Sequence, residues 1–486
     1  MPRRRDLLLL CGVLAWFNWG LESLRTGGLD RLAENPIELF SPPWTALRAF
    51  VSRDGDERLY WEYSRLALGQ EPDLDLLAEK RLGDVARNRR DIASRIRPGP
   101  GPRLPYRDFG FEYPPLSLAL MLLPRVVAAD LPSYRLAYGL CVALLVFASG
   151  VVTARLADTL GVRAPPHPWK RLALYTLAIG PILVGRFDVL PAFLAALGLW
   201  LLLAERELAA GVVMGAAVLA KLYPLLVAMP WLALLWKEGR ARRPLRFAAG
   251  LALSIVALSA PFLVLAPRSF LESTLVFGAR PFQVESTVGA LTLFFCGRES
   301  VTASFGSVNV RTPAALDAAW SLALPLTIVA AVLAIVLAPD SDRSVRDDAP
   351  ERCGSASATR GQVYVTWTTA VVACILVTSK VLSPQFLIWL LPLCPLVTDL
   401  GSWAGLLAAA VLTQTVYPYL YDLLVDDGNR WIAALVVVRN GLLLFVGGRL
   451  VRAALSSSSA GPRGSPATSC PPAETTAGPC CRRRCP

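Results

Sequence analysis

Apolar runs recur from one end of the chain to the other, separated by shorter polar segments. About 17–25 apolar residues in helical form cross the roughly 30 Å of hydrocarbon in a bilayer. The pattern predicts an all-α, polytopic bundle of transmembrane helices with about 10–12 crossings. The predicted spans are Asp6–Gly20, Pro114–Ala129, Tyr134–Leu156, Leu172–Gly185, Phe187–Ala204, Gly211–Trp236, Phe247–Ala266, Leu316–Ala338, Val363–Ser379, Gln385–Thr398, Trp403–Leu420 and Trp431–Leu450.

The composition agrees with a membrane protein. The chain has 486 residues, of which 54% are hydrophobic and 18% are charged, whereas soluble domains are about 25% charged. His167 is the only histidine in the sequence. Ser-His-Asp hydrolysis and His-based metal sites are therefore disfavoured, and proton transfer must rely on carboxylates, tyrosines or lysines.

The formal charge of +12 reflects membrane topology rather than a nucleic-acid partner. Lys and Arg gather at Arg3–Arg5, in the 237–246 loop, and at Arg449 and Arg452. Positive residues stay on the cytoplasmic side of a membrane. We therefore predict a multi-pass protein of the cell membrane, in contact with membrane lipids, with both termini in the cytoplasm.

The chain divides into a membrane domain, residues 1–452, and a tail, residues 453–486, whose composition predicts disorder in the cytoplasm. Residues 21–112 are predicted to form the first extracytoplasmic loop. Within this loop, Asp54–Gly69 has the spacing of an amphipathic helix that lies on the membrane surface. Residues 71–104 add a charged stretch and a Gly/Pro-rich linker.

One part of the predicted topology has two solutions. If Leu172–Gly185 crosses the membrane once, the motif Gly185–Leu190 lies on the cytoplasmic side. If that segment dips in and returns, the motif faces outward. Charge counting does not decide between them.

Carboxylates cluster in two places in the first loop. Asp54 and Asp56 flank a glycine, and such a pair can supply a general base or bind a divalent cation, although Asp and Gly are also ordinary turn residues. Asp108, Glu112 and Tyr113 precede two prolines at the start of an apolar run. A helix N-terminus favours an acidic residue, so an acidic cap with an interfacial tyrosine is the alternative there.

Charged residues also lie within or beside the predicted spans. A charge inside the bilayer is costly unless it reaches a partner or water, so such a residue is a functional candidate. Near a span end, a long side chain can instead reach the interface. These candidates are Lys221 in "VLAKLYPLL", Lys380 in "SKVLSPQ", Arg280, Gln283 and Glu285 in "ARPFQVES", and Arg186 and Asp188 in "GRFDVL".

Six of these motifs, in this order, carry a family resemblance. The series "DGDERLYWEYSRLALG", "PYRDFGFEYPPLSLALMLLP", "GRFDVLPAFLAAL", "AKLYPLLVAMP", "RPFQVES" and "SKVLSPQFLIWLLP" resembles the GT-C superfamily of membrane-integral glycosyltransferases. It is most similar to glycosyltransferase family 87, which includes polyprenol-phosphate-mannose-dependent α-mannosyltransferases. The layout also resembles the eukaryotic glycosylphosphatidylinositol mannosyltransferase I. The resemblance covers roughly residues 1–450.

The chain departs from the family pattern at two positions. In relatives, the glycine that ends the amphipathic helix is followed almost at once by Pro-Tyr, whereas here Glu71–Leu104 intervenes before Pro105. Phe386 also replaces a tyrosine that often follows the glutamine of the last motif. The insert could cap the acceptor site or bind a different acceptor.

The resemblance implies transfer of a hexose, most often mannose, from a polyprenyl-phosphate sugar to a lipid or glycan acceptor on the extracytoplasmic face, with inversion. Asp56, or alternatively Asp54, would be the general base. No cofactor is expected, apart from a divalent cation that this pair could hold. The predicted substrate-binding residues are Tyr60, Asp108, Glu112, Tyr113, Arg186, Asp188, Lys221, Arg280, Gln283, Glu285, Lys380 and Gln385.

A transporter or flippase of lipid-linked sugars is the alternative function. An intramembrane lysine and broken helices also occur in transporters. The sequence shows no internal repeat of the kind that many transporters have, and a long outer loop with clustered carboxylates favours an enzyme.

Overall fold

A computed structural model describes residues 56–79, 85–99, 101–275, 280–304, 306–338 and 353–459. The predicted first span, Asp54 and residues 460–486 of the tail therefore lie outside the described residues, whereas residues 453–459 of the tail belong to the last helix, which ends at Ser459. The described part of the chain is almost entirely helical, which confirms the predicted fold class. Among the described residues, six helical segments are long and apolar enough to cross a membrane. They are α7 (Leu131–Leu160), α12 (Arg242–Leu265), α15 (Ala314–Trp320) with α16 (Ala323–Leu337), α17 (Cys353–Thr378), α18 (Leu400–Gln414) with η10 (Thr415–Tyr419), and α20 (Arg430–Ser459).

Shorter apolar helices complete the bundle between α7 and α12. They are α6 (Pro115–Leu122) with η2 (Leu123–Val126), α8 (Pro168–Ile179) with η4 (Gly180–Leu183), α9 (Val189–Leu203), α10 (Glu207–Ala220) and α11 (Tyr223–Lys237). A short 3-10 turn, η3 (Gly161–Arg163), ends α7. Helices α10 and α12 approach closely because both carry glycines at their contact. A Cβ atom on Gly211 would collide with the carbonyl oxygen of Phe247, and one on Gly250 with that of Leu208.

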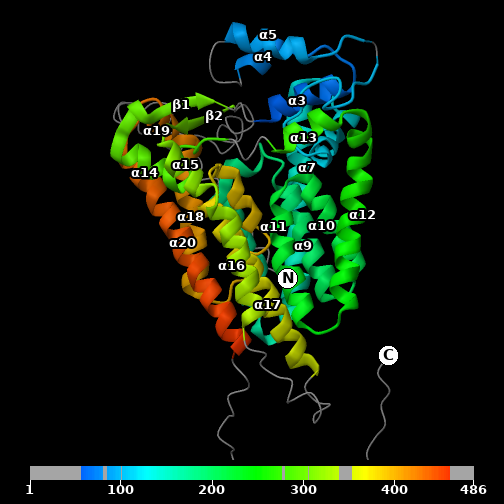
Figure 1. The fold of residues 1–486 in the computed structure, drawn as a ribbon, viewed down its shortest axis with the longest axis vertical. Helices are drawn as coiled ribbons and strands as arrows, with labels where there is room; N and C mark the ends of the chain where they lie inside the picture. Colours follow the sequence, from blue (N-terminus) through cyan, green and yellow to red (C-terminus); the bar gives the residue numbers. More distant parts are fainter. Residues whose placement is uncertain are drawn as a thin grey trace, which may run out of the picture.

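The remaining elements gather at one end of the bundle, which we call the α3 end (Figure 1). The helices α4 (Leu74–Glu79) and α5 (Val85–Arg95) form the outermost layer, α3 (Glu57–Ala67) lies beneath them, and α13 (Pro267–Leu275) lies beneath α3. Beside these helices lie α14 (Thr287–Cys296), η6 (Gly297–Ser300), the antiparallel hairpin β1 (Val301–Ser304) and β2 (Ser307–Val310), and α19 (Tyr421–Val425). This second group encloses a small hydrophobic core of its own around Phe282, Val310 and Val436, separate from the core of the bundle.

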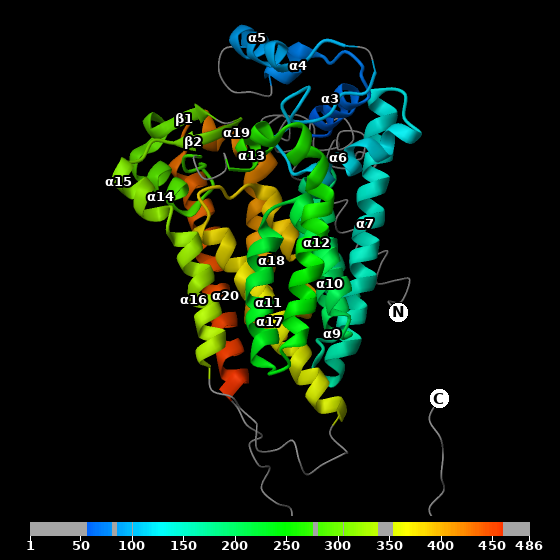
Figure 2. The same ribbon diagram turned by 45° about the vertical axis from the view of Figure 1, so that its right-hand side comes forward.

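Three predicted spans differ from the structure. The segment predicted as Pro114–Ala129 forms only α6 and η2, too short to cross the bilayer. Both of its ends stay at the α3 end, because Tyr113 packs against Tyr60 of α3 with ring centres 6.3 Å apart and the Arg125 guanidinium lies 3.9 Å from the centre of the Trp61 ring. Helix α7 then runs away from this end (Figure 2). Arg155 and Arg163, near the far end of α7, consequently lie at the end of the bundle opposite α3.

The predicted span Gly211–Trp236 is broken rather than continuous. Lys221 separates α10 from α11 with extended backbone angles, φ −162° and ψ 144°. Pro224 lies in the first turn of α11, where its missing N–H is tolerated. The predicted span Gln385–Thr398 is also wrong as an α-helix. It forms two short 3-10 segments, η8 (Pro384–Leu390) and η9 (Cys394–Leu396), because its prolines remove backbone donors that an α-helix needs.

Candidate active site

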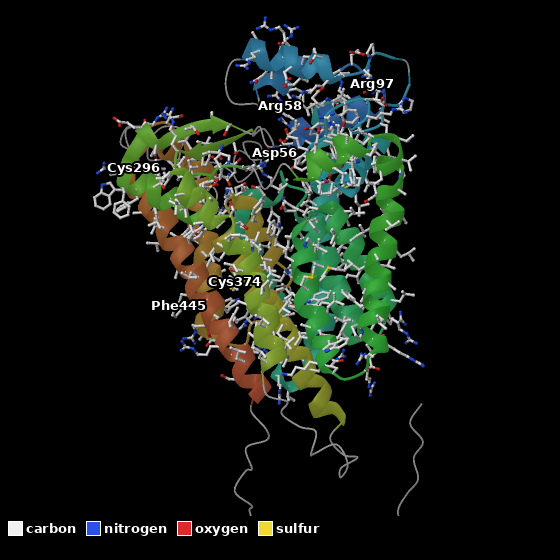
Figure 3. All side chains as sticks on the ribbon, viewed as in Figure 1. Asp56, Arg58, Arg97, Cys296, Cys374 and Phe445 are labelled. Carbon is white, nitrogen blue, oxygen red and sulfur yellow. The ribbon has the colours of Figure 1, made fainter. Side chains whose placement is uncertain are left out.

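The N-terminus of α3 meets the turn between η4 and α9 at the α3 end of the bundle. Asp56 immediately precedes α3, and its carboxylate forms an ion pair with the guanidinium of Arg186. Figure 3 labels Asp56 at this end, below the layer that carries Arg97. The contact answers the question of sidedness for the Gly185–Leu190 motif. This motif faces the same side of the membrane as the first loop.

Arg186 has a second partner on the opposite side. Its Nη2 donates a hydrogen bond to the hydroxyl of Tyr417 at 3.0 Å, and the guanidinium carbon lies 5.7 Å from the centre of that ring. Tyr417 belongs to η10, the π-helical turn after α18. Arg186 is therefore held between α3 and η10, with its side chain only 12% exposed.

A second cation–carboxylate pair lies two residues further along the same turn. The ammonium of Lys221 contacts Asp188 Oδ1 at 2.5 Å, and the indole N–H of Trp389 donates to the same oxygen at 2.8 Å. Asp188 is 1% exposed, so it depends on these two donors for its stability as an anion. Because the helix is broken between α10 and α11, the Lys221 side chain reaches this buried carboxylate. A continuous helix would carry Lys221 past Asp188.

Aromatic rings surround the two pairs. The Lys221 ammonium lies 4.9 Å from the centre of the Phe187 ring and 4.7 Å from that of Phe386, distances at which cation–π attraction applies. Tyr113 packs edge-on against Phe187 at 4.9 Å, and Tyr60 does so at 5.8 Å. These rings exclude water from one side of the charges, which strengthens their electrostatic interactions.

The segment between α13 and α14 approaches the same region from the other side. Arg280 is half-buried, and its positive charge lies near enough to interact electrostatically with both the Lys221 ammonium and the Tyr113 phenol. The backbone N–H of Gln283 donates to the carbonyl of Lys380 at 3.0 Å. The Lys380 ammonium turns toward Asp317 Oδ2 at 2.9 Å, so it is paired with α15 rather than with the two central pairs.

Glu285 lies deeper in the second core than the other predicted residues. It is fully buried and pairs with Arg439 of α20 at 3.3 Å, while its carbonyl accepts from Asn440 at 3.1 Å. Burial raises the pKa of Glu285 to about 7, against the opposing effect of Arg439. This arrangement ties the segment that carries Gln283 to α20.

Besides Lys380 and Glu285, three more predicted residues lie away from the two central pairs. Asp108 is enclosed in its own loop by Arg107 at 2.9 Å, Arg97 at 3.9 Å and the backbone N–H of Leu104 at 2.8 Å. The hydrogen bond from Arg107 lowers the pKa of this carboxyl below its ordinary value. Glu112 is exposed at the start of α6, and Gln385 is half-buried in η8.

Sequence reasoning missed three residues that the structure brings to this region. Trp389 and Tyr417 contact the predicted Asp188 and Arg186 directly, and Arg439 pairs with Glu285. Arg439 carried a usable signal, because it interrupts the apolar run "ALVVVRNGLLLF". Trp389 and Tyr417 carried none, since aromatic residues are common near membrane interfaces.

Within the ranges that the structure describes, no group of three His, Cys, Asp or Glu side chains could hold a metal ion. Asp54 lies outside those ranges, so the metal alternative for the Asp54 and Asp56 pair stays a prediction. Asp56 itself is engaged by Arg186.

Comparison with known proteins identifies the family. The sequence model of glycosyltransferase family 87 matches residues 111–353, half of the chain, including the Arg186 turn and the Lys221 break. Among solved structures, the chain is similar to ArnT from Cupriavidus metallidurans in the apo state, with 15% identity, a TM-score of 0.28, and coverage of 86% of this chain and 78% of that chain. No curated protein matches the sequence. The extent of the family match shows that the chain belongs to glycosyltransferase family 87 and is a membrane-bound glycosyltransferase.

Proposed function

We propose that this glycosyltransferase moves a hexose, with mannose as the first candidate, from a polyprenyl-phosphate sugar to a lipid or glycan acceptor, with inversion at the sugar carbon. The observation that carries the proposal is the convergence of Asp56, Arg186 and Lys221. A carboxylate that can accept a proton lies beside two cations that can bind a phosphate, at one end of the membrane-spanning bundle.

The two cations suit a phosphate leaving group. A sugar phosphodiester carries one negative charge, and the polyprenyl phosphate that leaves gains a second as the glycosidic bond breaks. Arg186 and Lys221 would therefore stabilise the transition state more than the bound donor, which is the requirement for catalysis. The planar guanidinium of Arg186 can also bind two phosphate oxygens at once.

Asp56 is the proposed general base. As the acceptor oxygen bonds to the sugar carbon, the bond from that carbon to the phosphate oxygen breaks, and the hydroxyl proton passes to the carboxylate. The leaving phosphate needs no proton because the cations compensate its charge. A single displacement of this kind inverts the configuration at the sugar carbon.

The surrounding side chains divide into two groups in this proposal. Tyr60, Tyr113 and Phe187 form an aromatic wall beside the charges, a surface on which a sugar ring can pack. Arg280 and Gln283 approach from the opposite segment and would contact the sugar or the phosphate. Lys380 would reach the phosphate only by leaving Asp317.

The charge distribution supports a site on the extracytoplasmic face. Basic side chains gather at the end of the bundle opposite α3. There, Arg243 pairs with Glu207 and Glu238, and Lys237 donates to the carbonyl of Ile335. Positive residues mark the cytoplasmic side, so the α3 end with Asp56 would lie outside and the C-terminal end of α20 inside.

A transfer assay in proteoliposomes tests the proposal. Radiolabelled polyprenyl-phosphate mannose and a mixture of lipid and glycan acceptors are supplied to the full chain, to Asp56→Asn and to Asp75→Asn. Asp75 is the matched control, an exposed acid of α4 that pairs with Arg89 at 3.3 Å. We expect label in the acceptor with the full chain and with Asp75→Asn, and none with Asp56→Asn.

Two further arms separate the alternatives. Loss of transfer with a chelator would show that a divalent cation takes part in the reaction. Other polyprenyl-phosphate hexoses replace mannose if mannose does not move. Movement of intact donor across the liposome membrane without transfer to any acceptor would instead support the flippase alternative.

A further inference from the structure

Both proposed phosphate-binding cations are paired with carboxylates in the structure, but the two pairs are built differently. Asp188 is 1% exposed and is fixed by Lys221 and by the indole N–H of Trp389. The Asp56 side chain is 24% exposed, and it makes no capping hydrogen bond to α3 although it occupies the N-cap position. Asp188 is therefore locked in place, whereas Asp56 can exchange its partner.

The Asp56 and Arg186 pair conflicts with the proposed reaction as long as it persists. The carboxylate directs an oxygen at the guanidinium, and the acceptor hydroxyl needs that carboxylate free. The guanidinium directs Nη1 at Asp56, and the donor phosphate needs that donor group. Each residue blocks the other, so the pair must open before transfer.

Tyr417 can hold Arg186 in place while the ion pair between Arg186 and Asp56 opens. Nη2 of Arg186 bonds to the Tyr417 hydroxyl while Nη1 faces Asp56. A guanidinium has five N–H donors in a rigid plane, so Nη2 can keep its contact with Tyr417 while Nη1 turns from Asp56 to a new anion. The Tyr417 ring lies 5.2 Å from that of Tyr421, which supports it on the far side.

We propose that Arg186 exchanges Asp56 for the donor phosphate, so that donor binding releases the general base, and that Tyr417 is the positioning residue that holds Arg186 during the exchange. The inference rests on the proposed function and adds to it the order in which the two substrates bind. The donor binds first, and the acceptor hydroxyl then meets a free Asp56. An acceptor that arrives before the donor finds the base engaged.

Equilibrium binding of undecaprenyl monophosphate to the full chain in nanodiscs tests the exchange without requiring turnover. Asp56 competes with this phosphate for Arg186, so Asp56→Asn should bind it more tightly than the full chain does, by about three- to tenfold, the size of one charge-assisted contact. Arg186→Gln should bind it more weakly. Asp75→Asn should match the full chain.

A double variant separates exchange from general electrostatics. If Asp56 acts through Arg186, the Asp56→Asn change has no effect on phosphate binding in the Arg186→Gln background. Tighter binding that persists in this background would mean that Asp56 merely repels the phosphate, and would overturn the exchange. Unchanged or weaker binding by Asp56→Asn alone would overturn it as well.

Tyr417→Phe tests the positioning role and keeps the ring while removing the hydroxyl. We expect kcat/KM for the donor to fall while the KM for the acceptor is unchanged. Tyr364→Phe, which removes a hydroxyl that bonds to Glu238 at the opposite end of the bundle, is the control that leaves both unchanged. Equal losses for donor and acceptor would overturn the positioning role. Failure of the full chain to bind undecaprenyl monophosphate would count against the proposed function itself, a result distinct from the others.

Discussion

Substitutions in the ion pair formed by Asp188 and Lys221 test its contribution to stability and its contribution to catalysis separately. In Lys221→Met, the Asp188 carboxylate would remain 1% exposed with the Trp389 indole as its only remaining donor. Removing one partner of a buried ion pair costs about 3–5 kcal/mol, because the other charge stays buried without compensation. We expect the free energy of unfolding to fall by this amount.

The double variant Asp188→Asn with Lys221→Met separates the two roles. The asparagine oxygen can still accept from Trp389, and no charge is left uncompensated, so most of the lost stability should return. Transfer activity should not return, because a phosphate-binding cation is missing. We expect the double variant to remain about 10²–10³-fold below the full chain, the usual effect of losing one group that stabilises transition-state charge.

Unfolding in mixed micelles, followed by the far-UV circular dichroism of the bundle, measures the stability changes, and the transfer assay measures activity. Lys380→Met is the stability control, because its partner Asp317 is 39% exposed and such pairs contribute at most about 1 kcal/mol. Two results would refute the reasoning. Lys221→Met could prove as stable as the full chain, or the double variant could regain transfer, which would make the role of Lys221 purely structural.

Three other perturbations probe the surroundings of the site. Arg439→Met removes the ion-pair partner of the fully buried Glu285. Because burial already raises the pKa of Glu285 to about 7, this carboxyl should take up a proton in the variant, so we expect a loss of about 1–3 kcal/mol in the same unfolding assay, with little further change on adding Glu285→Gln. Asp317→Asn should change the unfolding free energy by less than about 1 kcal/mol, while a larger loss would show that its pair with Lys380 is structural. Asp108 has a lowered pKa, so its stabilisation is present above the ordinary value and is lost as the pH falls through the lowered one. Acid protease should therefore begin to cleave the loop of the full chain below about pH 4, whereas Asp108→Asn should show no such step.

The sequence predicts much of the bundle because hydrophobic length is a local property. It does not predict which apolar segments stop short. Pro114–Ala129 has the composition of a span, but its α-helix ends after Leu122, and Tyr113 and Arg125 at its two ends contact rings of α3. The break at Lys221 could be suspected from the nearby Pro224, yet the extended backbone there depends on the buried Asp188 that Lys221 reaches.

Candidate site residues were predictable where a charge was out of place. Lys221, Arg186 and Asp188 were found in this way, and the structure brings all three together. Carboxylates in the polar first loop do not stand out in this way, because the residues around them are also polar. Asp56 and Asp108 look alike in sequence, but only Asp56 reaches Arg186, because that choice depends on how the loop folds onto the bundle.

A structure of the full chain in nanodiscs with undecaprenyl monophosphate bound would test the central claim most directly. We predict that the phosphate lies within hydrogen-bond distance of the Arg186 guanidinium and the Lys221 ammonium, with the Asp56 carboxylate no longer in contact with Arg186. A phosphate bound away from both cations, with the Asp56 and Arg186 pair intact, would contradict the proposed site and the exchange built on it.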